Sequence, residues 1–161
     1  RHPEPGMMMT AFEMSFAVLV LLLTPGPTNS LMLLAGAERG WPGAARLIPA
    51  ELAGYLLTVL PLSLMGTTVL SEHHALRTAV TLAAAVWVAL LAFRLWRAPG
   101  TGGAGMAVDA RALFVTTALN PKALIFGLVL LPSPDRLAAN LALFAGLVVL
   151  VAVFWAGIGA V

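Results

Sequence analysis

Five apolar stretches, each long enough to cross a bilayer as a helix, divide this 161-residue chain. They cover residues 9–37, 44–70, 76–96, 112–131 and 137–161. A bilayer core about 30 Å thick needs about 20 helical residues to cross it. Only 10% of the residues are charged and 60% are hydrophobic, whereas a soluble domain has about 25% charged residues. The sequence therefore predicts an all-α, polytopic transmembrane protein whose residues 1–161 form a single membrane domain.

Composition excludes several other classes of protein and site. The net charge is +2, and the basic residues are scattered among apolar runs, so a nucleic-acid partner is not expected. The chain has no cysteine, which excludes disulfides and thiolate metal sites. The histidines, His2, His73 and His74, lie outside the apolar stretches, so neither a metal site nor a cofactor is expected. Residues 1–8 are expected to be disordered or to precede the natural start.

The distribution of basic residues predicts how the chain is oriented, because Lys and Arg favour the cytoplasmic side of short loops. The loops after the first and third stretches carry five basic residues, Arg39, Arg46, Arg94, Arg97 and Arg111. The loops after the second and fourth stretches carry only Arg77 and Arg136. The N-terminus is therefore expected outside, with the first and third loops in the cytoplasm.

The first stretch is interrupted near its middle by "TPGP" at residues 24–27. Proline has no backbone N–H, so two carbonyls of the preceding turn lose their helical donors, and lipid cannot replace them. Thr24 or Gly26 can cap a new helix, and Pro25 or Pro27 suits its first position. This second helix would direct free N–H groups near Asn29 into the membrane interior. A helix N-terminus of this kind favours an anion such as a carboxylate.

The fourth stretch carries a similar interruption, Asn120-Pro121-Lys122. Asn120 is a good cap, and Pro121 suits the first helical position. Lys122 adds a positive charge at a depth where a charge costs about 2.5 to 3.5 kcal/mol on insertion scales, so it should have a partner. Glu51, in the second stretch, is the best candidate for that partner. Glu51 could instead pair with Arg46 or lie at the membrane interface.

Interrupted helices in corresponding positions of two halves are typical of transporters built from inverted repeats. The first three stretches would form one half of three helices. The fourth and fifth would begin a second half, so a sixth helix is expected beyond residue 161. The sequence thus predicts five membrane segments of a six-helix 3+3 inverted repeat.

These motifs, in this order, resemble the LysE/RhtB family of bacterial amino-acid efflux proteins. The resemblance rests on "TPGP" at 24–27, "GAERGWPGAAR" at 36–46, "AGY" at 53–55, "FRLWR" at 93–97, "LNPKA" at 119–123 and "LP" at 131–132. It implies a six-helix carrier of the bacterial inner membrane that exports amino acids or close derivatives, driven by the proton gradient. The chain departs from the family pattern at Thr28, where many members have Asn or Asp after Pro-Gly-Pro.

The expected function is export of a small amino acid by alternating access, with no bond of the substrate made or broken and hence no enzyme activity. The expected substrate-binding residues are Thr24, Pro25, Gly26, Pro27, Asn29, Glu51, Asn120, Pro121 and Lys122. The two helix starts, with Asn29 and Lys122, would hold the substrate carboxylate. Glu51 would hold the amino group or a coupling proton.

Three alternatives remain open: an exporter of inorganic cations, a non-transporting membrane subunit and an intramembrane enzyme. A cation exporter should carry several acidic, Cys or His ligands inside its helices, and a hydrolase should carry a nucleophile beside a base. The expected partners are the substrate and the lipid bilayer, and the sequence leaves a homodimer open.

Overall fold

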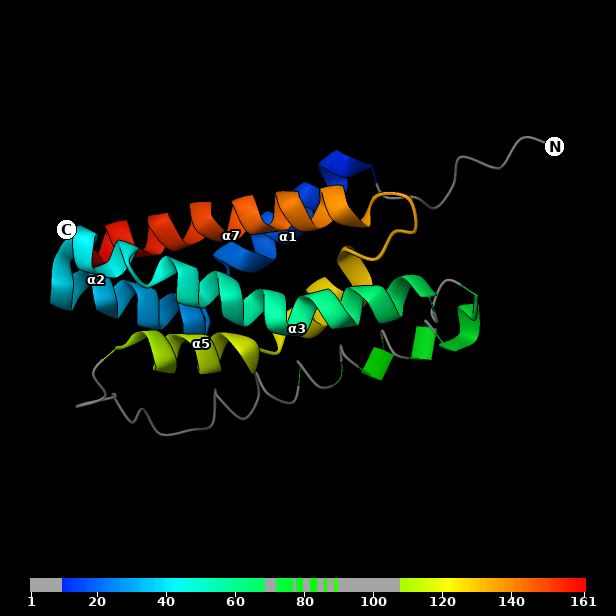
Figure 1. The fold of residues 1–161 in the computed structure, drawn as a ribbon, viewed down its shortest axis with the longest axis horizontal. Coiled ribbons are helices and arrows are strands. Elements are labelled where there is room, and N and C mark those ends of the chain that lie inside the picture. The colour runs from blue at the N-terminus through cyan, green and yellow to red at the C-terminus, as the bar shows by residue number, and fades with distance from the viewer. Residues whose placement is uncertain are drawn as a thin grey trace.

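The computed structural model of the chain describes residues 10–68 and 108–161, and between them residues 72–76, 78, 79, 82, 83, 86 and 89. The structure in these ranges is helical, and none of the described residues lies in a β-strand. The elements in chain order are α1 (Ala11–Leu23), α2 (Pro27–Ala45), α3 (Ile48–Thr68), α5 (Ala110–Ala118), α6 (Lys122–Ile125), the π-helical turn η1 (Phe126–Leu130) and α7 (Leu137–Ala160) (Figure 1). The prediction of an all-α fold is confirmed.

Two of the described helices, α3 and α7, are long and apolar enough to cross a membrane. Two further helix pairs pass the same test together but are bent, α1 with α2 by 61° and α5 with the α6–η1 segment by 51°. The described residues therefore provide two candidate membrane spans, or up to four if each bent pair is one span. The predicted third span, 76–96, falls mostly outside the described residues, and the predicted 3+3 repeat stays a prediction.

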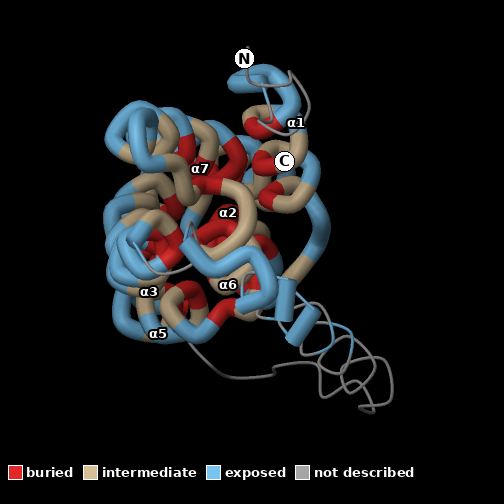
Figure 2. The backbone as a smooth tube through the Cα atoms, turned by 90° about the vertical axis from the view of Figure 1, so that its right-hand side faces the viewer, coloured by how far each residue is buried: buried red, intermediate tan, exposed pale blue. Residues whose placement is uncertain are grey.

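The described helices lie roughly along a common long axis and run in two opposite directions (Figure 1). The segment formed by α1 and α2 and the helix α7 run toward the same end, whereas α3 and α5 run the opposite way. Viewed along this axis in Figure 2, buried residues lie inside the bundle and exposed residues on its outer faces. A bundle of helices that run in opposite directions along one axis is compatible with spans that cross a bilayer both ways.

Large apolar side chains cover the outer faces of three of the helices. Those exposed on α1, α3 and α7 include Phe12, Phe16, Leu57, Leu60, Leu64, Met65, Leu150, Phe154 and Ile158. Soluble monomers rarely expose so much contiguous apolar surface, whereas a lipid-facing surface requires it. This distribution supports a membrane protein.

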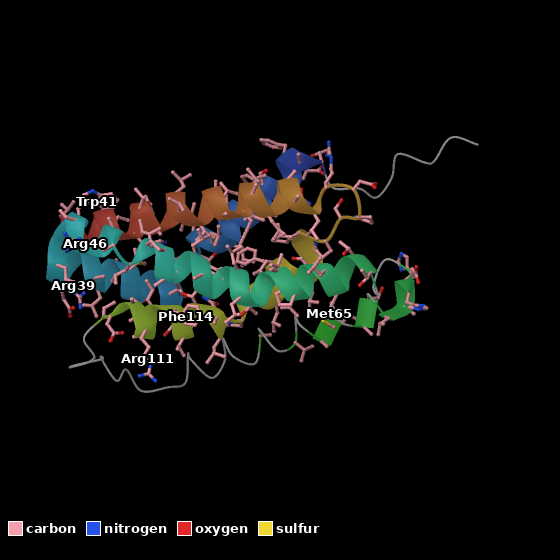
Figure 3. All side chains as sticks on the ribbon, viewed as in Figure 1. Arg39, Trp41, Arg46, Met65, Arg111 and Phe114 are labelled. Carbon is pink, nitrogen blue, oxygen red and sulfur yellow. The ribbon has the colours of Figure 1, made fainter. Side chains whose placement is uncertain are left out.

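Arginine side chains mark one end of the bundle. Arg39 and Arg46 lie near the end of α2 with Trp41, and Arg111 lies in the first turn of α5 at the same end of the bundle (Figure 3). Met65, toward the far end of α3, lies away from them. The structure thus places three of the five arginines from the predicted cytoplasmic loops together, while Arg94 and Arg97 lie outside the described residues.

The helix boundaries follow local sequence signals. Thr10 and Glu13 form a capping box at the start of α1, with Glu13 N donating to Thr10 Oγ1 at 3.2 Å and Thr10 N donating to Glu13 Oε2 at 2.8 Å. Such a pair satisfies two otherwise free N–H groups. Helix α2 extends beyond residue 37, the predicted end of the first apolar stretch, to Ala45, and its backbone is non-helical at Gly40, where φ is 66°. Glycine adopts this left-handed conformation without steric cost.

Among the described elements, α2 and α7 make the most extensive contact, and glycine residues allow the two helices to approach closely. A Cβ atom at Gly36 would lie 2.2 Å from the carbonyl oxygen of Ala156, and one at Gly159 would lie 1.9 Å from that of Leu33. Small residues commonly allow membrane helices to approach in this way. Gly159 thus lies at a close helix contact, whereas Gly146 and Gly157 have no described atom within 4 Å of such a Cβ.

We expect Gly36→Val to destabilise the protein, because the new side chain would push α2 and α7 apart. Overpacking of this kind costs about 1 to 3 kcal/mol. The matched control is Gly146→Val on the exposed face of α7, where no atom opposes the new side chain. Thermal unfolding in detergent should show a lower midpoint for Gly36→Val alone. Equal midpoints for the two variants would contradict the observed packing.

Candidate substrate site at the two helix breaks

The first break, residues 24–26, separates α1 from α2. Helix α1 ends at Leu23, and Gly26 precedes α2 with an extended backbone, φ −168°. Pro27 is the first residue of α2, where its missing N–H has no cost. Of the alternatives predicted for this helix start, the structure selects Gly26 and Pro27. Since Gly26 has no side chain to cap the helix, the first-turn N–H groups of α2 have no side-chain acceptor.

Asn29 satisfies two of the carbonyls at the first break. Its amide nitrogen Nδ2 donates to the carbonyl oxygen of Leu22 at 2.7 Å and to that of Thr24 at 3.0 Å. Both hydrogens of the amide are therefore engaged with backbone, and the side chain is buried. The Asn29 side chain thus stabilises the backbone at the first break. Because its amide hydrogens are already engaged, Asn29 would bind a carboxylate through its backbone N–H.

The second break, residues 119–121, separates α5 from α6. Asn120 caps the new helix through its side chain, because its Oδ1 accepts from the backbone N–H of Lys122 at 3.0 Å. The helix begins at Lys122, with Pro121 immediately before it already in helical conformation, one residue later than predicted. The π-helical turn η1 then completes this span, with Leu131 N donating to Phe126 O at 3.0 Å.

The two breaks meet inside the bundle. The ammonium group of Lys122 donates to the carbonyl of Thr24, which lies 98 residues away in the sequence. A Cβ atom at Gly26 would lie 3.4 Å from both Nζ and Cε of Lys122. Asn120 Nδ2 donates to Thr28 Oγ1 in the first turn of α2 at 2.9 Å. The predicted pairing of the two helix starts is therefore present in the structure.

A buried polar cluster connects the breaks to α3 and α5. Thr28 also accepts from Thr117 Oγ1 at 3.3 Å, and Asn120 Nδ2 lies 3.5 Å from the hydroxyl oxygen of Tyr55. Thr28, Tyr55, Thr117 and Asn120 are each at most 4% exposed. Such a cluster is stable in an apolar interior only where its members bond to one another.

Sequence reasoning missed Thr28, Tyr55 and Thr117 as members of this cluster. One signal was available for Tyr55, which follows Glu51 by one helical turn and so shares its face. Thr28 was noted only as a departure from the family pattern. In the structure the Thr28 side chain bonds to Asn120 at the second break, whereas the Asn29 side chain bonds to backbone carbonyls at the first break.

Glu51 is the second charged residue of the site. It lies on α3, is 1% exposed, and its Oε2 atom has no hydrogen-bond partner. It interacts electrostatically with Lys122 and with Tyr55, but no ion pair joins it to Lys122 in the described part of the chain. The sequence predicted that Lys122 pairs with Glu51. In the structure these two side chains interact electrostatically without a direct bond, and Lys122 donates its hydrogen bond to the Thr24 carbonyl. Among the buried residues that the structure describes, Glu51 and Lys122 are the charged ones.

The predicted site residues separate into two groups by exposure. Asn29, Glu51, Asn120 and Lys122 are buried, Gly26 and Pro121 are partly buried, and Thr24, Pro25 and Pro27 are exposed. The exposed group shapes the backbone at the first break, and the buried group supplies the polar chemistry.

Comparisons of the chain with protein-family models, with curated protein sequences and with solved structures found no match. The chemistry of this site must therefore be inferred from its own residues. It offers one buried ammonium group, one buried carboxyl group and the uncapped first turn of α2. No cluster of three or more His, Cys, Asp or Glu side chains suited to a metal ion occurs among residues 10–68 and 108–161 or the described residues between them.

Proposed function

We propose that this protein is a membrane transporter that exports amino acids or close derivatives, as the resemblance to the LysE/RhtB family implies. The observation that carries the proposal is the meeting of two broken spans at Lys122, with the buried Glu51 nearby. A zwitterionic amino acid carries one carboxylate and one ammonium group. A site with one buried ammonium group and one buried carboxyl group can bind both.

In this proposal Lys122 binds the substrate carboxylate. The ammonium group would exchange its hydrogen bond to the Thr24 carbonyl for a stronger, charge-assisted bond to the substrate. The uncapped N–H groups of Thr28 and Asn29 in the first turn of α2 lie beside the same break and favour a negative charge. Glu51 would receive the substrate ammonium group.

Broken helices also suit the movement that alternating access requires. The contact between the breaks combines a few polar bonds and the glycine Gly26 with an apolar cluster that includes Leu22 and Ala123. We propose that the breaks separate to admit the substrate and close around it. No bond of the substrate is made or broken, so the protein acts as a carrier.

The test is efflux from bacterial cells that express the protein. Cells loaded with a mixture of labelled amino acids should lose at least one of them faster than cells with an empty vector, and this loss should slow when the proton gradient is collapsed. Unchanged efflux of every amino acid would contradict the proposal. Increased tolerance to a metal salt without amino-acid efflux would favour the cation exporter instead.

We also propose that the protein lies in the bacterial inner membrane, with the end that carries Arg39, Arg46 and Arg111 in the cytoplasm. The chain has no cysteine, so single cysteines report topology without background. A membrane-impermeant maleimide should label Ser133→Cys in intact cells and should label Arg46→Cys only after lysis. The reverse pattern would show the opposite orientation.

A further inference from the structure

Glu51 is a buried acidic residue with an oxygen atom that has no hydrogen-bond partner among the described residues. Its side chain is buried, its Oε2 atom has no hydrogen-bond partner, and the nearest cation, Lys122, donates to the Thr24 carbonyl instead. An ionised carboxylate buried without a partner is very costly. A bound proton removes this cost without requiring any other ligand.

A metal ion would not serve as well at this position. The described residues contain no group of three or more His, Cys, Asp or Glu side chains that could hold a metal ion, and Lys122, the charged group that acts on Glu51, repels cations. Tyr55, one turn further along α3, is the other described titratable group that interacts with Glu51. The surroundings thus favour a proton, or an ammonium group that donates hydrogen bonds to the carboxylate.

We propose that the Glu51 carboxyl is a shared site, which holds a proton when the carrier is empty and the α-ammonium group of the amino acid when the carrier is loaded. This inference rests on the proposed transport function. The O–H bond of Glu51 breaks as substrate binds, and the proton passes to the water on the side to which the site is open. Because the two occupants exclude each other, the carrier exchanges a proton for each amino acid.

The experiment uses the purified protein in vesicles and the amino acid found in the efflux test. Vesicles with an acidic lumen in alkaline buffer should accumulate the labelled amino acid through the wild-type protein. Glu51→Gln keeps the shape of the side chain but cannot release a proton. We expect this variant to lose gradient-driven accumulation at least tenfold and to retain exchange of labelled for unlabelled amino acid at equal pH, with a lower affinity.

Ser63→Ala is the matched control, because Ser63 is also buried on α3 and its hydroxyl has no hydrogen-bond partner. It should behave like the wild-type protein in both assays. Gradient-driven accumulation by Glu51→Gln at the wild-type level would overturn the shared site and leave the transport function intact. Absence of any amino-acid transport by the wild-type protein would overturn both.

A direct measurement of protons covers the case in which Glu51→Gln does not fold or bind. Addition of the amino acid to purified wild-type protein in weakly buffered solution should release up to about one proton per bound molecule, by the linkage of the two occupants. Glu51→Asp, which keeps the carboxyl, should also release protons. Binding to the wild-type protein without proton release between pH 5 and 9 would overturn the proposal.

Discussion

Lys122→Met abolishes amino-acid transport while leaving the folded protein at least as stable as the wild type: this is the largest effect that we expect. Methionine has a similar length but no charge, so the substrate carboxylate loses its principal partner. A charge-assisted hydrogen bond of this kind contributes about 1.5 to 3 kcal/mol, which corresponds to a ten- to hundredfold loss of affinity. Removal of a buried charge, in contrast, lowers the desolvation cost of folding.

The measurement combines efflux with thermal unfolding in detergent. Lys122→Arg is the control, because it retains the charge and changes the shape of the donor. It should keep more activity than Lys122→Met. Full efflux by Lys122→Met would exclude a role for Lys122 in binding the carboxylate. Unfolding of Lys122→Met at a much lower temperature would show that the bond to Thr24 matters mainly for stability.

Asn120→Ala has the second largest expected effect, because this side chain bonds to both broken spans. Its Oδ1 accepts from Lys122 N at 3.0 Å and its Nδ2 donates to Thr28 Oγ1 at 2.9 Å. Loss of a helix cap costs about 0.5 to 2 kcal/mol, and an unsatisfied buried group costs about 1 to 3 kcal/mol. We therefore expect lower stability together with lower transport.

Asn140→Ala provides the matched control for this prediction. The Asn140 amide donates to the Leu131 carbonyl at 3.1 Å, which also lies where a span ends but away from the two breaks. Its removal should lower the unfolding temperature and leave efflux per folded molecule unchanged. A comparable loss of specific activity in both variants would mean that Asn120 has no special relation to the site.

The sequence predicted the features that follow from backbone chemistry. Pro25, Pro27 and Pro121 cannot donate hydrogen bonds within a helix, so the positions of both breaks could be predicted without a structure. Apolar length likewise predicted the helices that include α3 and α7. The cap positions were predicted to within a residue, as Gly26 and Asn120 show.

The partners of the polar side chains could not be predicted in the same way, because they depend on how the spans rotate against one another. Asn29 is aimed back at the end of α1, and Lys122 reaches across the bundle to a backbone carbonyl instead of a carboxylate. Backbone carbonyls have no sequence signature, since every residue carries one. The hydrogen bond between Thr28 and Asn120 also depends on the rotation of α2 about its axis, because this rotation decides toward which neighbour the Thr28 side chain points.

The central claim is that one site recognises both charges of an amino acid, with Lys122 binding the carboxylate and Glu51 the ammonium group. Competition in vesicles tests it most directly, with the exported amino acid, the amine that lacks its carboxylate and the acid that lacks its amino group each added against labelled substrate. We expect the amino acid alone to compete effectively, because each analogue lacks one of the two groups that the site binds. Competition by the amine as strong as that of the amino acid would contradict the carboxylate site, and equally strong competition by the acid would contradict the role of Glu51.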